Sequence, residues 1–228
     1  MSDINIYLSG GGGAEDSFLL DEKFMNGVNE NKKILYIPLA METDALGFEA
    51  CYDWIINTLS KFSKEFVDIV MWTNLDGKSW DDIKDFGAIY IGGGNTFKLL
   101  NNIYDSGFIN LLRAFIDAEK IVYGGSAGAI IMGKSINTVD EENDKKYRHH
   151  EGLDIISGMS IICHYTEQLD CKILNYISKI KTGVIALPEK TGLFISNSNA
   201  QVVGYEPAYL FDLNGGRNIV KIGRNIPL

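Results

Sequence analysis

The sequence is short of the residues that mark several large classes of protein. Among its 228 residues there are four prolines and three cysteines, and no linker-like tract of Ser, Gly and Pro or of like charges interrupts it. We therefore expect a single domain over residues 1–228. The cysteines form neither a C-x-x-C pair nor an even set, which argues against a disulfide framework and against a thiolate metal site: Cys51, Cys163 and Cys171.

Positive charge and long apolar runs are also scarce. Lys and Arg number 21 against 30 Asp and Glu, a formal net charge of −9. Because affinity for nucleic acid comes largely from Lys and Arg that displace counterions, nucleic acid is not an expected partner. Apolar runs such as residues 129–132 fall far short of the ~20 residues that span a bilayer, and the first residues do not resemble a signal peptide. These absences predict a cytoplasmic protein without a membrane partner and leave homo-oligomer formation open.

What the sequence does contain is an alternation of two kinds of apolar segment. Short β-branched or aromatic runs predict strands, and longer stretches with an apolar residue every three or four positions predict helices. Strands are expected at 4–8, 33–38, 66–72, 88–91 and 121–123, helices at 48–59, 96–103, 111–115 and 167–180, a strand-like run at 135–139, and short strands or hairpins at 184–187, 192–196, 201–204 and 208–212. The alternation is typical of an α/β fold with a mainly parallel sheet flanked by helices.

One short motif predicts chemistry. Gly124-Gly125-Ser126-Ala127-Gly128 fits G-x-S-x-G and lies between a predicted strand and an apolar run that can continue as a helix. In this context a sharp turn exposes the serine hydroxyl as a nucleophile, and the backbone N–H groups that follow it can stabilise an oxyanion. The structural alternative is a glycine turn whose serine only caps the helix. We interpret Ser126 as a nucleophile and the Ala127 N–H as a candidate oxyanion-hole donor.

A serine hydroxyl is a poor nucleophile without a base, and the chain has three histidines. His149 and His150 lie in a polar stretch, where a solvated loop residue is the expectation. His164 ends the apolar run 159–163, and sheets of this kind place their chemistry at strand ends. His164 is therefore the expected base, with a purely structural histidine as the alternative.

A carboxylate should orient the imidazole of such a base and stabilise its charged form. One candidate is Glu189, just beyond the predicted strand 184–187. The others are Asp140 and Glu141, which follow the strand-like run 135–139. Spacing alone does not choose among them.

Two further glycine-rich turns follow predicted strands. The segment Gly92-Gly93-Gly94-Asn95-Thr96 opens a helix, so its backbone N–H groups suit an anion or a developing oxyanion, with Asn95 as a helix cap and Thr96 as a substrate contact. Neither G-x-G-x-x-G nor a Walker lysine pattern is present, which disfavours a nucleotide site. The turn at residues 10–13 is interpreted as a turn at the sheet edge, with a contact to the ligand as the alternative.

Taken together, these segments resemble peptidase family S51, the dipeptidase E and cyanophycinase family of serine peptidases. The resemblance rests on three segments that occur in the family's order: Ile91-Gly92-Gly93-Gly94-Asn95-Thr96 with Leu99-Leu100, Gly125-Ser126-Ala127-Gly128-Ala129, and His164-Tyr165-Thr166. It implies a flavodoxin-like or class I glutamine-amidotransferase-like fold. It also implies hydrolysis of short peptides near an Asp residue by a Ser–His–acid charge relay, with a small peptide as substrate and with no metal or cofactor.

The resemblance also assigns roles to single residues. Ser126 and His164 match the family's nucleophile and histidine, and the backbone amides of Gly93 or Gly94 and of Ala127 match its oxyanion hole.

For the acid, Glu189 falls at the cyanophycinase-like position, and Asp140 or Glu141 falls near the dipeptidase E-like one; we favour Glu189. The chain departs from its relatives in the helix predicted over 167–180, which carries Lys172 and Lys179 but no arginine. A bidentate guanidinium clamp on an acidic substrate is therefore not predicted from this helix.

Two other classes of function compete with a peptidase. One is an esterase or an amidotransferase-like enzyme on a similar sheet, although amidotransferases of this shape carry a cysteine where this chain has Ser126. The other is a small-molecule-binding module that has kept the fold without catalysis. The second class requires that His164 does not reach Ser126.

Overall fold

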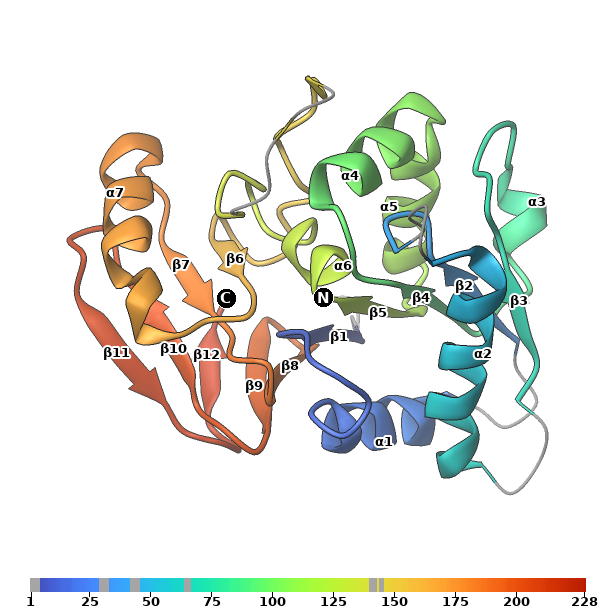
Figure 1. Cartoon of the computed structure of the whole chain (residues 1–228), viewed down its shortest axis with the longest axis horizontal. Helices are drawn as coiled ribbons and strands as arrows, with labels where there is room; N and C mark the ends of the chain where they lie inside the picture. Colours follow the sequence, from blue (N-terminus) through green and yellow to red (C-terminus); the bar gives the residue numbers. More distant parts are fainter. Residues whose placement is uncertain (1–4, 29–32, 42–45, 64–66, 140–142, 144–145) are drawn as a thin grey trace.

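A large sheet forms the centre of the molecule (Figure 1). The computed structural model describes residues 5–28, 33–41, 46–63, 67–139, 143 and 146–228. In this part of the chain the sheet has eight strands in the order β12-β9-β8-β1-β5-β4-β2-β3. Their bounds are β1 Ile6–Ser9, β2 Ile34–Ile37, β3 Ile69–Met71, β4 Ala88–Ile91, β5 Ile121–Gly125, β8 Thr191–Ser196, β9 Asn199–Gly204 and β12 Asn225–Pro227.

The first five strands pair in parallel, and β8, β9 and β12 extend the sheet in antiparallel fashion beside β1. Counted from β2, the parallel strands have the 2-1-3-4-5 order of flavodoxin-like sheets, with β1 in the fifth place. The N-terminal strand is thus central, because Leu8 lies opposite Gly124 of β5 on one side and Leu193 of β8 on the other. The predicted α/β class with a mainly parallel sheet is confirmed.

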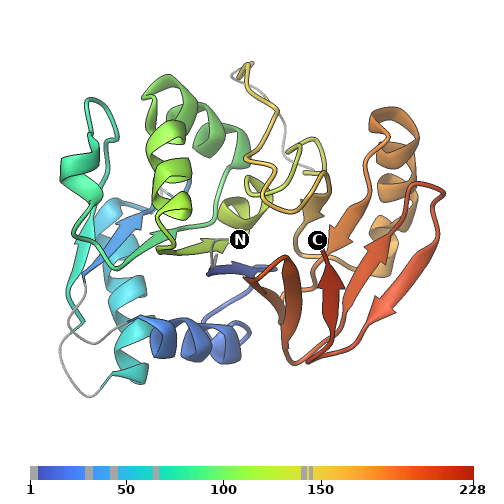
Figure 2. The same ribbon diagram turned by 180° about the vertical axis from the view of Figure 1, so that it is seen from behind.

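Helices cover both faces of this sheet (Figures 1 and 2). On one face lie α1 (Phe18–Gly27) and α2 (Phe48–Leu59), and on the other lie α3 (Trp80–Ile83), α4 (Thr96–Asp105), α5 (Phe108–Asp117) and α6 (Ala127–Ile130). Successive strand residues point to opposite faces, so Leu8 packs with the second group of helices and Tyr7 with the first. Burial on both faces is why the parallel strands read as continuous apolar runs.

A second sheet of four described strands, in the order β11-β10-β7-β6, lies beside the large one (Figure 1). It consists of β6 Ser160–Ile162, β7 Val184–Ala186, β10 Ala208–Phe211 and β11 Arg217–Val220. Helix α7 (Asp170–Ile180) buries Ile173 and Ile177 against this sheet, after a short 3-10 turn (Glu167–Leu169). Residues of both sheets share one apolar cluster, in which Ile161 and Ile185 join the main core. A single domain over residues 1–228 stays a prediction.

Several elements differ from the sequence expectation. The prediction of a strand over 135–139 is wrong, because these residues form turns with one isolated bridge, Ser135 to Glu151. Its polar groups bind the neighbouring strand β6 instead of forming a ladder, since the Ser135 N–H donates to Ser160 Oγ and Thr138 Oγ1 donates to the Ile161 carbonyl. Helix α6 ends at Ile130, and α1, α3, β11 and β12 were not anticipated. No helix within the described ranges is long and apolar enough to cross a bilayer.

Candidate active site

Ser126 occupies a sharp turn between β5 and α6. Its backbone has φ +47° and ψ −106°, a left-handed conformation that costs a non-glycine residue about 1–3 kcal/mol. The turn is held by hydrogen bonds, because the Ser126 N–H donates to the Ser9 carbonyl at 3.1 Å and the Ser126 carbonyl accepts from the Ala129 N–H at 2.8 Å. A Cβ at Gly128 would lie 2.5 Å from the Ile91 carbonyl oxygen, which explains the glycine there. The turn presents the hydroxyl above the carboxyl ends of the parallel strands.

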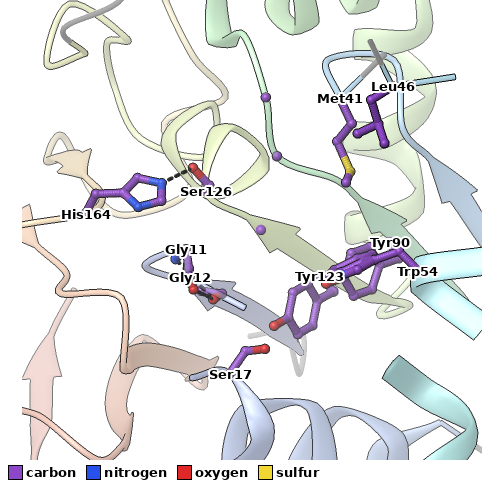
Figure 3. Close-up of a pocket in the computed structure, with 14 residues that line it drawn as sticks. Gly11, Gly12, Ser17, Met41, Leu46, Trp54, Tyr90, Tyr123, Ser126 and His164 are labelled. Carbon is purple, nitrogen blue, oxygen red and sulfur yellow. Dashed lines mark hydrogen bonds between the residues drawn. The ribbon is translucent and has the colours of Figure 1, made fainter. Parts of the chain in front are cut away.

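His164 lies just after β6 and reaches Ser126. Its Nε2 is 2.8 Å from Ser126 Oγ, and the two side chains face each other in Figure 3. The backbone of His164 is also left-handed, at φ +52°, and its N–H donates to the Gly10 carbonyl at 2.9 Å. The condition that would have left only a binding module, a histidine out of reach of Ser126, is not met.

Glu189 lies on the other side of the imidazole. Its Oε1 is 2.8 Å from His164 Nδ1, within the 2.6–3.2 Å range usual for such pairs. A carboxylate can only accept, so Nδ1 carries the proton and Nε2 is left to accept from the Ser126 hydroxyl. Both side chains are half exposed. The arrangement is a continuous chain of hydrogen bonds from Glu189 to the serine oxygen.

The alternative residues have other neighbours or lie outside the described ranges. The ring of His149 stacks on Tyr104 at 4.3 Å, and His150 Nδ1 lies 2.8 Å from Asn137 Oδ1. Asp140 and Glu141 lie outside the described residues.

Backbone groups at the end of β1 connect the three parts of this site. The Ser9 carbonyl accepts from Ser126, the next carbonyl, of Gly10, accepts from His164, and the Gly10 N–H donates to Thr191, two residues after Glu189. The turn at residues 10–13 was expected at the sheet edge, with a ligand contact as the alternative; its Gly10 binds His164 and Thr191, and its Gly11 and Gly12 border the first pocket described below. A glycine run directly after the first strand was the available signal.

Gly11 packs directly on the imidazole and provides a sharp test of this geometry. A Cβ there would lie 2.2 Å from His164 Cε1, and φ is +110°. Gly11→Ala should therefore displace the ring and lower the rate of reactions that His164 promotes at Ser126 by roughly a hundredfold. The matched control is Gly77→Ala, which has φ +68° with nothing within 4 Å of the new methyl group and should keep full activity. Wild-type turnover by a folded Gly11→Ala protein would contradict this account.

The glycine turn after β4 approaches the nucleophile from a third direction. A Cβ on Gly93 would lie 3.2 Å from Ser126 Cβ, so its backbone borders the serine. The N–H groups of Gly93, Gly94 and Ala127 have no acceptor among the residues described. They are therefore free to donate to a substrate oxygen.

Asn95 and Thr96 form the start of helix α4, which follows this turn. Asn95 caps α4, since its Oδ1 accepts from the Lys98 N–H at 2.8 Å, as the sequence indicated. Thr96 is fully buried. Neither lines the two pockets described next, and a substrate contact for Thr96 stays a prediction.

Two pockets border the Ser126–His164 pair. The first, of about 320 Å³, is drawn in Figure 3 and is bordered by Ser9, Gly11, Gly12, Ser17, Met41, Leu46, Trp54, Tyr90, Gly93, Gly94, Tyr123, Gly125, Ser126 and His164. The second, of about 420 Å³, is bordered by Gly94, Ser126, Ile130, Thr138, Val139, Ile162, Cys163, His164, Thr166, Leu169 and Lys172. Ser126, His164 and Gly94 border both. A substrate spanning the two would place its central bond at the serine hydroxyl.

Metal ligands do not gather at this site. Within the ranges described, no group of three or more His, Cys, Asp or Glu side chains is placed to hold a metal ion. Cys163 is buried and free beneath the site, and burial raises the pKa of its thiol well above the ordinary value. Its Sγ lies 3.6 Å from the carbonyls of Ser9 and Ser126. Cys163 therefore acts as a small apolar residue of the core.

The fold and this constellation define an α/β serine hydrolase. The model of peptidase family S51 matches residues 6–203, so the chain belongs to peptidase family S51 and is a serine-type peptidase. Peptidase E of Shewanella denitrificans is 29% identical over 199 residues, which cover 83% of this chain and 82% of that protein. Peptidase E of Haemophilus influenzae is 31% identical over 144 residues, covering 59% of this chain and 61% of that protein.

Solved structures agree on the fold. The crystal structure of a peptidase from an acI-B1 Actinobacterium superposes with a TM-score of 0.74 at 20% identity, covering 100% of this chain and 98% of that one. The resemblance predicted from the sequence, to the dipeptidase E-like peptidases of family S51, is confirmed.

Proposed function

We propose that Ser126, His164 and Glu189 form the charge relay of a peptidase that hydrolyses short peptides. The observation that carries the proposal is the pair of 2.8 Å contacts that link Ser126 Oγ to His164 Nε2 and His164 Nδ1 to Glu189 Oε1. A serine paired with a histidine base, which a carboxylate orients, is the arrangement that activates a hydroxyl for acyl transfer. A peptide is the acyl donor that membership of this family indicates.

The geometry supports a two-step reaction. Ser126 Oγ attacks the peptide carbonyl carbon while its proton passes to His164 Nε2, and the imidazolium that forms is stabilised by the Glu189 carboxylate. His164 then returns the proton to the departing amine, which leaves an acyl-serine. A water molecule, deprotonated by the same nitrogen, hydrolyses the ester and regenerates Ser126.

The backbone N–H groups of Ala127 and of Gly93 or Gly94 are the proposed oxyanion hole. Ala127 is the first residue of α6, directly after Ser126, and Gly93 and Gly94 lie in the turn after β4. Because they are fixed before the reaction begins, they stabilise the negative oxygen of the tetrahedral intermediate without reorganisation. No side chain is required for this role.

The site accepts a small substrate, since each pocket is of a size that holds about one or two amino-acid residues. Lys172 is the lysine among the residues that border the second pocket. Lysine offers a point charge and not a bidentate fork, so we propose acceptance of acidic groups without strict selection for aspartate. Hydrolysis of a dipeptide library by the purified protein tests this directly.

An esterase on the same fold is the second candidate, and it is supported by the same relay. Parallel measurement of matched peptide and ester substrates separates the two, because an esterase would hydrolyse the ester alone. Reaction of Ser126 with a fluorophosphonate probe separates either enzyme from a binding module. A cytoplasmic location, the lack of nucleic-acid partners and homo-oligomer formation stay predictions from the sequence.

Glu189→Gln tests the choice of acid. The substitution keeps the size of the side chain but removes the charge that stabilises the imidazolium, so kcat should fall by as much as about 10⁴-fold. Thermal unfolding should change little, because the side chain is half exposed. Asp140→Asn and Glu141→Gln serve as controls with near-wild-type turnover. A larger loss in either control than in Glu189→Gln would reassign the acid.

A further inference from the structure

Large apolar side chains gather at one end of the first pocket. Trp54 belongs to α2, Tyr90 to β4 and Tyr123 to β5, and Met41 and Leu46 lie between β2 and α2. The rings of Tyr90 and Tyr123 stack at 4.2 Å, and Trp54 packs edge-on against Tyr90. In Figure 3 these five side chains lie away from the histidine of the site. The pocket therefore extends from the serine–histidine pair to an aromatic wall.

Part of this wall is open to a ligand. Leu46 is 38% exposed, and Met41 and Trp54 are partly exposed, whereas Tyr90 and Tyr123 are buried. Apolar surface that faces water is unfavourable, and an apolar group that covers it removes that surface from water. Exposed apolar side chains around a concave site are a usual mark of ligand binding. The accessible contacts in this pocket are therefore those of Met41, Leu46 and Trp54.

The same pocket has no partner for a charged substrate side chain. Of the described residues that border it, none is Lys, Arg, Asp or Glu, and His164 is the only titratable group near the serine. Two of its polar atoms are already engaged within the protein, because Ser17 Oγ donates to the buried Asp21 at 2.7 Å and Met41 Sδ accepts from the Tyr36 hydroxyl at 3.1 Å. A charged group would lose its hydration there without compensation. An apolar side chain has no such penalty.

We propose that the first pocket is a subsite for an uncharged aromatic side chain of the substrate, which packs on Met41, Leu46 and Trp54. The inference rests on the proposed function of Ser126, which borders the same pocket. A volume of about 320 Å³ accommodates one such side chain. The indole and the thioether offer a bound ring edge-to-face and sulfur–aromatic contacts in addition to burial. Because the nucleophile borders the pocket, the recognised residue lies next to the cleaved bond, on its acyl or its amine side.

Thermal unfolding tests the subsite without catalysis. N-acetyl-phenylalaninamide at ten times its Kd should raise the Tm of the wild type by a few degrees, and N-acetyl-alaninamide at the same concentration should raise it less. Trp54→Ala should remove most of the difference between the two amides. Trp80→Ala, which removes an exposed tryptophan of α3 that borders neither pocket, is the matched control and should behave as the wild type.

A second variant keeps the test decisive if Trp54→Ala does not fold. Leu46→Asp places a charge at a position that is already 38% exposed, so the fold should tolerate it. The charge opposes the burial of an apolar ring beside it, and the difference between the two amides should again be lost. Leu213→Asp, at an exposed leucine that borders neither pocket, is the matched control and should keep the difference.

Kinetics then identify which side of the cleaved bond the subsite serves. The dipeptides Ala-Ala, Phe-Ala and Ala-Phe are compared. Phenylalanine on the recognised side should raise kcat/KM about tenfold to a hundredfold over Ala-Ala in the wild type. An acyl-side subsite favours Phe-Ala, and an amine-side subsite favours Ala-Phe. Trp54→Ala and Leu46→Asp should lower this ratio toward one, whereas Trp80→Ala and Leu213→Asp should keep it.

The outcomes separate the subsite from the proposed function. If the phenylalanine amide stabilises the wild type but not Trp54→Ala, while none of the three dipeptides is hydrolysed, the subsite stands and the peptidase assignment of the site fails. Hydrolysis of the three dipeptides at similar rates overturns the subsite and leaves the relay intact. A preference for phenylalanine that persists in both Trp54→Ala and Leu46→Asp has the same consequence, because the ring is then bound outside this pocket.

Discussion

Ser126→Ala should abolish peptide hydrolysis, with a loss on the order of 10⁶ in kcat, because it removes the nucleophile of the proposed relay. The fold should survive, since the backbone bonds of Ser126 to Ser9 and Ala129 do not involve the side chain. The measurements are turnover of a dipeptide, labelling by a fluorophosphonate probe and the Tm. The probe should label wild type and not the variant.

An exposed serine provides the control for this experiment. Ser178 lies on the outer side of α7, and its hydroxyl only bonds the carbonyl of Asn175. Ser178→Ala should retain both turnover and labelling. Activity of Ser126→Ala near that of the wild type would end the assignment of the nucleophile.

His164→Ala should be nearly as damaging as the loss of the serine. Members of such a relay act as a unit, so the double variant Ser126→Ala/His164→Ala should be no worse than either single variant. This non-additivity is the signature that separates a base from a residue that only supports the turn. Steady-state assays of the two single variants and the double variant compare their turnover.

The other two histidines are the controls. His149 stacks on Tyr104 and lies 3.3 Å from Asp105, and His150 bonds Asn137, so neither contacts the serine. His149→Ala and His150→Ala should leave turnover within a few-fold of wild type. A greater loss in one of these than in His164→Ala would show that the wrong histidine was chosen.

The fold could be predicted from the sequence where the pattern of apolar residues along a segment determines its secondary structure. The strands of the parallel sheet are buried on both faces, so their apolar runs stand out, and β4 begins and ends at the predicted residues 88 and 91. The strands β11 and β12 carry exposed polar residues and were missed. The run 135–139 failed for the opposite reason: it has the composition of a strand, but its polar groups find partners on β6.

The sequence predicts the part of the candidate site that lies in the G-x-S-x-G motif. The turn around Ser126 carries its geometry in its glycines, and His164 was chosen because it follows a strand. Glu189 could not be separated from Asp140 and Glu141, since which loop meets the imidazole depends on how distant strands are ordered. The placement of Glu189 against His164 is now visible, while its catalytic role stays a proposal.

The glycine run at residues 10–13 signals a turn in the sequence, but the contacts of this turn with Ser126 and His164 could not have been predicted. The importance of the turn follows from the central position of β1, which no local pattern indicates.

The position of β1 has a consequence for the order in which the protein becomes active during its synthesis. This strand is synthesised before β5 and β8, yet it pairs with both of them, and the carbonyls of Ser9 and of the following Gly10 bind the N–H groups of Ser126 and His164. Because a chain is synthesised from its N-terminus, the sheet around β1 cannot be completed until β8 has been made. The nascent chain therefore carries Ser126 in an unfinished setting until β8 has been made. A peptidase built this way stays inactive while it is incomplete, and fragments that lack β8 should show no hydrolytic activity.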